Sequence, residues 1–211
     1  MTAPDPTALA FVHRFEAATA AARPPLLLLH GTGGDESDLL PLGRTVAPGA
    51  ALLSPRGAVL ENGMPRFFRR LAEGVFDEDD VRRRAADLAA FVGEARAAYG
   101  LPAPVALGFS NGANIAAAVL LLHPGVLAGA ALLRPMRPLS DLPVPDLADL
   151  PVLMLSGALD PIVPEANARG LAEGLRAAGA RVAHTVLPAG HGLSEADVTA
   201  TRDWLGDRAA A

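Results

Sequence analysis

Short apolar runs alternate with helical patterns along most of this 211-residue chain. A continuous apolar run of about four to eight residues that ends at turn-forming residues is typical of a strand buried on both faces of a sheet. Runs of this kind, each followed by a loop rich in Gly, Pro, Ser or Asp, lie at 26–29, 50–53, 105–109, 127–133 and 152–155. Helical patterns lie at 81–99, 111–122, 165–178 and 194–206, and a strand-like segment at 181–187 precedes the last of them. This alternation predicts an α/β fold with a mostly parallel central sheet and helices on both faces.

We predict a single domain over residues 1–211, because no repeat, linker or low-complexity tract divides the chain. The length suffices for one substantial core, and 51% of the residues are hydrophobic. The segment 9–16 is expected to add an antiparallel edge strand. Two irregular stretches, 54–80 and 134–150, are long enough to be functional loops. The second is too short for a helical lid domain.

Composition excludes several classes of protein. The net charge of −5 and the lack of a clustered basic excess argue against a nucleic-acid or anionic-membrane partner. The acidic run 77–80 and the arginines at 82–84 are expected to cap and lace the first turns of one helix. The absence of cysteine excludes disulfides, thiolate zinc sites and a cysteine nucleophile. Neither a signal peptide nor a membrane-spanning apolar run is visible, so a soluble cytoplasmic protein is expected.

The pentapeptide Gly108-Phe109-Ser110-Asn111-Gly112 lies between an apolar strand and a helical pattern. This is the context of a nucleophile elbow, a strained turn that exposes a serine hydroxyl while flanking glycines let strand and helix pack closely. The same residues also fit an ordinary glycine-rich turn into a buried helix. The choice between the two depends on the rest of the chain.

An acid and a base are expected later in the chain, because a serine hydroxyl is a poor nucleophile until a base accepts its proton. Asp160 follows the apolar strand at 152–155 and lies in a loop at its carboxyl end, although a turn aspartate before proline would look the same. The competing acids precede that strand and would emerge at its other end or in the proline-rich loop; they are Asp141, Asp146 and Asp149.

His191 is the best candidate for the base, because it lies between two glycines in the loop after the 181–187 segment. The remaining histidines are interpreted as structural. His13 and His30 precede the serine, His184 lies within a strand, and His123 closes a helix, where an imidazole suits the helix dipole.

The glycine-rich loop His30-Gly31-Thr32-Gly33-Gly34 follows the first apolar strand. In a fold with a nucleophile elbow, this loop and the residue after the nucleophile supply the backbone N–H donors of the oxyanion hole, which assigns Thr32 and Asn111. A phosphate-binding loop is excluded, because a Walker lysine is missing and the spacing does not fit the dinucleotide fingerprint.

Taken together, these four motifs resemble the α/β-hydrolase superfamily, and more narrowly the phospholipase/carboxylesterase family that includes acyl-protein thioesterases. The resemblance extends from Leu26 to Trp204, and the segment 66–71 is similar to the aromatic loop of the bacterial carboxylesterase branch. It implies hydrolysis of small soluble esters through an acyl-Ser110 intermediate, without metal or cofactor. The expected partner is a small-molecule ester, and the family also implies a homodimer.

Several apolar residues are candidates for the pocket wall, although core packing would explain each of them equally well: Phe67, Phe68, Leu71, Met136 and Ile162. Arg69 and Arg70 could meet an anionic group of the substrate or simply remain hydrated. The alternatives to an esterase are a thioesterase or small amidase of the same fold, and a non-catalytic small-molecule sensor.

Overall fold

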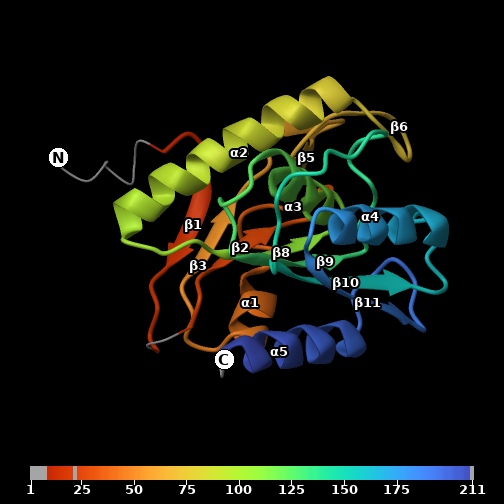
Figure 1. Cartoon of the computed structure of the whole chain (residues 1–211). Helices are drawn as coiled ribbons and strands as arrows, with labels where there is room; N and C mark the ends of the chain where they lie inside the picture. Colours follow the sequence, from red (N-terminus) through yellow and green to blue (C-terminus); the bar gives the residue numbers. More distant parts are fainter. Residues whose placement is uncertain (1–8, 21–22, 210–211) are drawn as a thin grey trace.

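The computed structural model of this protein describes residues 9–20 and 23–209. They form an α/β fold in which helices cover both faces of a central sheet (Figure 1). The strands are β1 (His13–Glu16), β2 (Leu26–Leu29), β3 (Leu52–Pro55), β4 (Val59–Glu61), β5 (Met64–Arg66), β6 (Arg70–Ala72), β7 (Val75–Phe76), β8 (Val105–Phe109), β9 (Gly129–Leu133), β10 (Pro151–Gly157) and β11 (Arg181–Leu187). The helices are α1 (Leu40–Val46), α2 (Glu78–Tyr99), α3 (Asn111–Leu122), α4 (Glu165–Ala177) and α5 (Glu195–Ala209).

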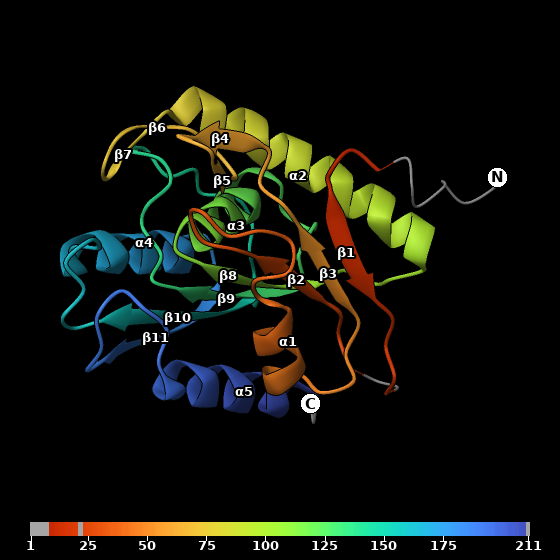
Figure 2. The same cartoon turned by 180° about the vertical axis from the view of Figure 1, so that it is seen from behind.

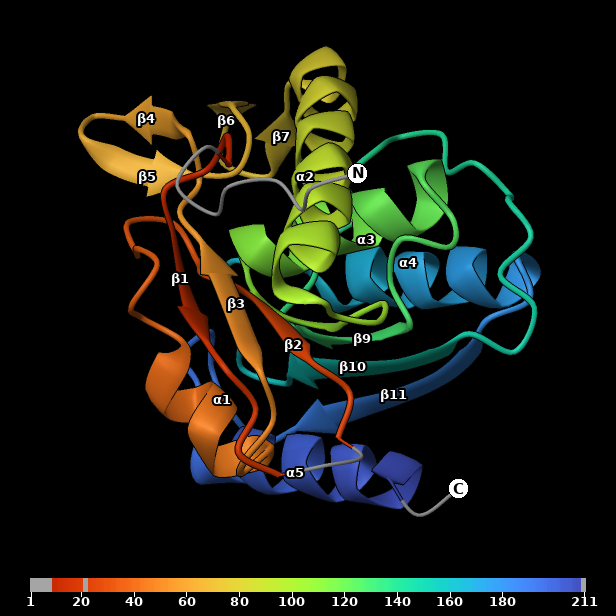
Figure 3. The ribbon, with the colours of Figure 1, turned by 90° about the vertical axis from the view of Figure 1, so that its left-hand side faces the viewer.

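The central sheet has seven strands in the order β1-β3-β2-β8-β9-β10-β11. The strands from β3 to β11 in this order pair in parallel, and β1 pairs antiparallel with β3 at the edge, as predicted (Figure 3). The chain passes from β2 to β3 on one side and then crosses to β8 on the other. The carboxyl ends of β2 and β8 therefore form the topological switch point, where ligands bind in open α/β sheets.

The continuous apolar strands are explained by two hydrophobic cores, one on each face of the sheet. In β2, Leu27 and Leu29 belong to the core that α2, α3 and α4 cover, whereas Leu26 and Leu28 belong to the core that α1 and α5 cover. The two layers are visible from both sides of the molecule (Figures 1 and 2). None of the helices in the described part of the chain is long and apolar enough to cross a membrane.

The acidic and basic run at the start of α2 acts as expected. The Asp77 side chain caps the helix by accepting from the Asp80 N–H, and Asp80 pairs with Arg83 and Arg84. The helix ends at Gly100, which adopts the left-handed conformation that favours glycine.

The segment 54–80 contains structure that was not predicted, namely the hairpins β4–β5 and β6–β7. An Asn62-Gly63 turn with positive φ at both residues connects β4 to β5, and this dipeptide is a strong hairpin signal. The short helix α1 was also missed, and β3 begins two residues later than expected. The stretch 134–150 is a loop without a helix, as predicted.

Candidate active site

Ser110 occupies a strained turn between β8 and α3. Its φ is 52°, which is uncommon for a residue with a side chain, and its N–H donates to the Leu133 carbonyl of β9. A Cβ on Gly108 would lie 2.6 Å from the Gly112 carbonyl oxygen, and a Cβ on Gly112 would lie 1.9 Å from the Leu29 oxygen. Both glycines are therefore required by the close approach of strand and helix, as a nucleophile elbow demands.

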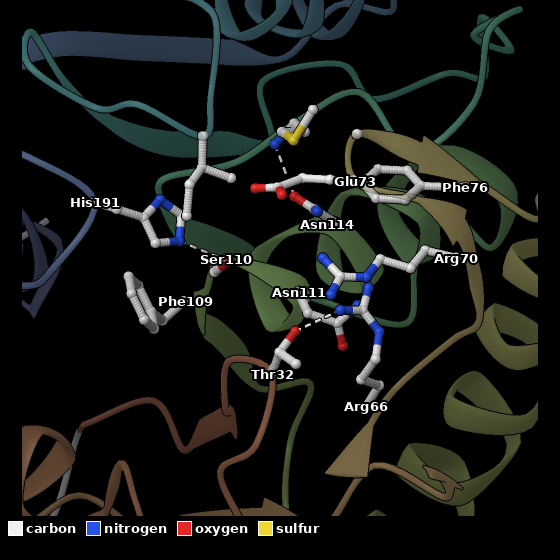
Figure 4. Close-up of a pocket in the computed structure, with 13 residues that line it drawn as sticks. Thr32, Arg66, Arg70, Glu73, Phe76, Phe109, Ser110, Asn111, Asn114 and His191 are labelled. Atoms are coloured by element: carbon white, nitrogen blue, oxygen red, sulfur yellow. Dashed lines mark hydrogen bonds between the residues drawn. The ribbon is translucent and has the colours of Figure 1, made fainter. Parts of the chain in front are cut away.

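The structure brings Ser110, His191 and Asp160 into one hydrogen-bonded chain. His191 Nε2 lies 3.0 Å from Ser110 Oγ (Figure 4), and His191 Nδ1 lies 2.8 Å from Asp160 Oδ2. These residues follow β8, β11 and β10 respectively, so three loops at the carboxyl edge of the sheet converge. The geometry allows His191 to accept the serine proton through Nε2 while Nδ1–H donates to the carboxylate.

Asp160 is held as a carboxylate by its surroundings. Its side chain is only 1% exposed, and Oδ1 accepts the N–H groups of Ile162 and Val163 at 2.8 and 3.0 Å. Burial acts to raise the pKa of Asp160, but the hydrogen bonds from His191 and from these two amides outweigh it, so the pKa lies below its ordinary value. The predicted acid is thus ionised and oriented toward His191.

Thr32 and Asn111, the residues expected to supply the oxyanion donors, line the same cavity as Ser110. Among the described residues, the Thr32 N–H donates no hydrogen bond. Asn111 is the first residue of α3, where N–H groups lack intrahelical partners. Both amides are therefore available to a ligand oxygen.

The end of β5 connects the two loops that carry these amides. Arg66 Nη1 donates to Thr32 Oγ1 at 2.6 Å, and the Phe67 N–H donates to Asn111 Oδ1 at 2.7 Å. Burial, followed by the neighbouring Arg70 cation, lowers the pKa of Arg66 from its ordinary value. The side chain of Arg66 is only 3% exposed, so the loop after β2 is tied to a fixed point of the protein.

A cavity of about 360 Å³ opens beside Ser110. Met136 and Ile162, two of the predicted wall residues, line it together with Phe76 and Phe109. The remaining lining residues are polar, charged or glycine: Thr32, Arg66, Arg70, Glu73, Gly74, Ser110, Asn111, Asn114 and His191.

The prediction that Phe67 and Phe68 form the pocket wall is wrong. Both are buried in the core at 2% and 0% exposure, and the ring of Phe68 packs edge-on against Phe76, which does line the cavity. Leu71 does not line it either, since it is 69% exposed on β6.

Charged groups gather at the end of the cavity away from His191. In Figure 4, Arg66 and Arg70 lie across the cavity from Ser110 and His191. Both arginines pair with one carboxylate, that of Glu61. Arg69 points elsewhere and pairs with Asp77, so of the two arginines considered from the sequence only Arg70 reaches the cavity.

Three of the other four histidines have side-chain partners that fit a structural role. His30 is buried, with Nδ1 beside the Gly31 carbonyl and Nε2 accepting the Gly57 N–H, and burial lowers its pKa. His13 contacts the Tyr99 hydroxyl, and His184 contacts Ser156 Oγ. His123 follows the last residue of α3, as predicted. Within the described ranges no group of His, Asp and Glu side chains could hold a metal ion.

Comparison with known proteins places the chain in a family. The sequence model of the dienelactone hydrolase family matches residues 69–205. The MhqD protein of Bacillus subtilis (strain 168), whose name calls it a hydrolase and gives no substrate, is 46% identical over 181 residues, covering 85% of this chain and 90% of its own.

Solved structures agree with this assignment. The Bacillus cereus carboxylesterase superposes with a TM-score of 0.93 at 43% identity over 96% of both chains. The Mesorhizobium loti carboxylesterase superposes with a TM-score of 0.90 at 38% identity over 96% of this chain and 98% of its own. Arabidopsis thaliana SOBER1, at 23% identity and a TM-score of 0.76 over 88% of this chain and 99% of its own, shares the fold.

The predicted α/β-hydrolase fold and the resemblance to bacterial carboxylesterases are confirmed by these matches. The family model that matches carries a different name from the phospholipase/carboxylesterase family that the motifs suggested. On the match over 69–205 and the identity to MhqD, this chain belongs to the dienelactone hydrolase family of the α/β-hydrolase superfamily.

Proposed function

We propose that this protein is a serine carboxylesterase that hydrolyses small carboxylic esters through an acyl-Ser110 intermediate. The observation that carries the proposal is the hydrogen-bonded chain from Ser110 Oγ through His191 to the Asp160 carboxylate, at 3.0 and 2.8 Å, beside a cavity. Nucleophile, base and orienting acid in this arrangement support acyl transfer as the reaction class.

In acylation, His191 Nε2 takes the proton of Ser110 as Oγ attacks the carbonyl carbon of the ester. The resulting oxyanion accepts hydrogen bonds from the N–H groups of Thr32 and Asn111, and the positive end of the α3 dipole adds to its stabilisation. The bond to the leaving oxygen then breaks, and the imidazolium returns its proton to the alcohol. Asp160 keeps His191 in the tautomer that presents an unprotonated Nε2 to the serine.

Deacylation reverses the roles with water as the nucleophile. His191 takes a proton from water, the oxygen attacks the acyl carbon, and the bond to Ser110 Oγ breaks as the serine recovers its proton. The products are the carboxylic acid and the free enzyme.

The cavity favours small substrates. Its volume of about 360 Å³ lies at the low end of ligand pockets, which span roughly 300–1,000 Å³. Its wall combines the apolar side chains of Phe76, Met136 and Ile162 with the charged groups of Arg70 and Glu73. A long fatty acyl chain would have to leave these charged groups without water, which is costly.

The proposal is tested by treating the purified protein with a fluorophosphonate probe and mapping the modified residue by mass spectrometry. Turnover of p-nitrophenyl acetate and octanoate is measured alongside. We expect labelling at Ser110, hydrolysis that is faster for acetate, and loss of both in Ser110→Ala. Ser140→Ala is the matched control, because Ser140 is exposed in the loop 134–150 and is absent from the lining of the cavity beside Ser110.

The outcome also separates the alternatives. Faster turnover of thioesters or amides than of esters, with Ser110 labelled, would make the protein a thioesterase or amidase. A folded protein that neither reacts with the probe nor turns over any of these substrates would contradict the esterase and favour a sensor.

A further inference from the structure

Arg134 is a buried arginine that the proposed chemistry does not use. It follows β9 directly, its φ is 57°, and its side chain is 0% exposed. The N–H groups of its guanidinium make five hydrogen bonds, and all the acceptors belong to residues far along the chain. A guanidinium held by this many hydrogen bonds has a fixed position and orientation.

Two of these bonds hold the backbone on both sides of His191. Arg134 Nε donates to the Gly190 carbonyl at 2.8 Å, and Nη2 donates to the Gly192 carbonyl at 3.2 Å. Glycine allows a wide range of backbone conformations, so the loop 190–192 gains little rigidity from its own residues. The planar fork of Arg134 fixes the peptide groups that flank the histidine.

Asp197 balances the charge of Arg134 and anchors it to α5. Its carboxylate accepts from Nη1 at 2.7 Å and Nη2 at 2.9 Å, is 1% exposed, and also accepts from the N–H and hydroxyl of Ser194. The remaining bond of the guanidinium goes to the Leu155 carbonyl of β10. The pair therefore connects β9, β10, α5 and the histidine loop.

A buried ion pair seldom adds net stability, because desolvation of the two charges offsets their attraction, and apolar residues of similar size often serve the fold as well. The stability of the fold alone does not explain why the guanidinium bonds to the carbonyls on either side of His191. Arg134 is absent from the lining of the cavity beside Ser110, so it does not reach the substrate.

We infer that Arg134, charge-balanced by Asp197, is a positioning residue that holds the backbone of His191 so that Nε2 stays within hydrogen-bonding distance of Ser110 Oγ. This inference rests on the proposed function, since it assigns Arg134 a part in keeping the base in place. Displacement of a catalytic group by about 1 Å can lower turnover by about 10²-fold.

Arg134→Lys is the first test. Lysine keeps the positive charge beside Asp197 but cannot span both glycine carbonyls with a planar fork. We expect a folded protein whose kcat for p-nitrophenyl acetate falls about 10- to 100-fold, with KM within about twofold of the wild-type value. Arg181→Lys is the matched control, because Arg181 also donates to a backbone carbonyl but is exposed and lies at the opposite end of β11 from the loop that carries His191. Wild-type kcat in a folded Arg134→Lys variant would overturn the inference.

The double variant Arg134→Met/Asp197→Leu covers the case in which Arg134→Lys does not fold. It removes both charges together, so no charge is left buried without a partner. A folded double variant with reduced kcat supports the positioning role, and one with wild-type kcat overturns it. Failure of both variants to fold would assign the pair to the fold itself and would equally overturn the inference.

A readout that does not need turnover separates this inference from the proposed function. The Nδ1–H of His191, which bonds to Asp160, should give a hydrogen-bonded proton resonance by NMR in the wild type. We expect that resonance to broaden or shift in Arg134→Lys and to stay unchanged in Arg181→Lys. If the fluorophosphonate probe does not label the wild-type protein, the esterase proposal is contradicted. If the Nδ1–H resonance is unchanged in Arg134→Lys, the positioning role is contradicted.

Discussion

Replacing Asp160 by asparagine should leave the fold intact and reverse the tautomer of His191. Asp160 Oδ1 accepts N–H groups from Ile162 and Val163, so only an oxygen fits at that position. The asparagine oxygen must therefore take the place of Oδ1, and its NH₂ group must face His191 Nδ1. Nδ1 then becomes an acceptor, the ring proton moves to Nε2, and Nε2 can no longer accept the proton of Ser110.

The expected loss follows from this reversal. In a serine protease the same substitution preserves the geometry and lowers kcat by about 10⁴-fold. That factor corresponds to about 5 kcal/mol of activation free energy. We expect a loss of this size in the initial rate of p-nitrophenyl acetate hydrolysis, with thermal unfolding close to that of the wild type.

Asp141→Asn is the matched control, because Asp141 is an exposed acid in the loop 134–150 that the sequence also offered as a candidate. Its turnover should equal that of the wild type. Retention of more than about a tenth of wild-type turnover in a folded Asp160→Asn variant would refute the assignment of the acid.

Three further predictions concern the elbow, the oxyanion loop and the response to acid. Gly112→Ala should prevent folding or lower Tm sharply, because the new Cβ would lie 1.9 Å from a backbone oxygen of β2. Gly93→Ala is the control and should be tolerated or stabilising, because its Cβ would enter open space. Equal Tm values for the two variants would contradict the packing argument. Arg66→Met removes the donor to Thr32 Oγ1 and should lower kcat by up to about 10²-fold, because removing an oxyanion donor outright costs about 10²- to 10³-fold. Wild-type kcat in this variant would contradict the role of Arg66. Burial acts to raise the pKa of Asp197, but hydrogen bonds from Arg134 and Ser194 outweigh it and hold the pKa below its ordinary value. The ionised Asp197 therefore stabilises the fold fully above about pH 3.9, and this contribution is lost as the pH falls through the lower pKa of the folded state. Urea unfolding should show stability that begins to fall below about pH 6.5, because the buried His30 with its lowered pKa resists protonation, and that falls further below about pH 3.9 as Asp197 is protonated. A rise in stability below about pH 3.9 would contradict the sign.

The convergence of Ser110, Asp160 and His191 could be predicted because each residue lies at the end of a strand or in the loop that follows one. Parallel strands bring their carboxyl ends to one edge, so the order of strands and loops was enough to place the three side chains near one another. The pocket wall could not be predicted in the same way. Phe67 and Phe68 lie in a loop whose backbone decides which side chain faces inward, and the sequence gives no periodicity there. The rings of Phe67 and Phe68 are buried in the core, and Phe76 from the β6–β7 hairpin lines the cavity instead.

Arg134 was missed for a different reason. In the sequence it is one arginine beside prolines at the start of an irregular stretch, where arginines are usually exposed. Its acceptors at Gly190, Gly192 and Asp197 are more than fifty residues away, so no local pattern marks it. By contrast, the Asn62-Gly63 turn was a readable signal that predicts the β4–β5 hairpin.

The four adjacent strands β8, β9, β10 and β11 each deliver one residue of the site, in the order Ser110, Arg134, Asp160 and His191. The positions of these residues relative to one another along the strand direction are therefore set by the strand register, for example by the pairing of Val152 with Ala130 and with Val182. A slip of one residue in any pairing would move a side chain by about 3.3 Å and turn it to the other face of the sheet. Substitutions in the interior of these strands, far from any substrate, can consequently abolish activity although every residue of the site is still present in the sequence.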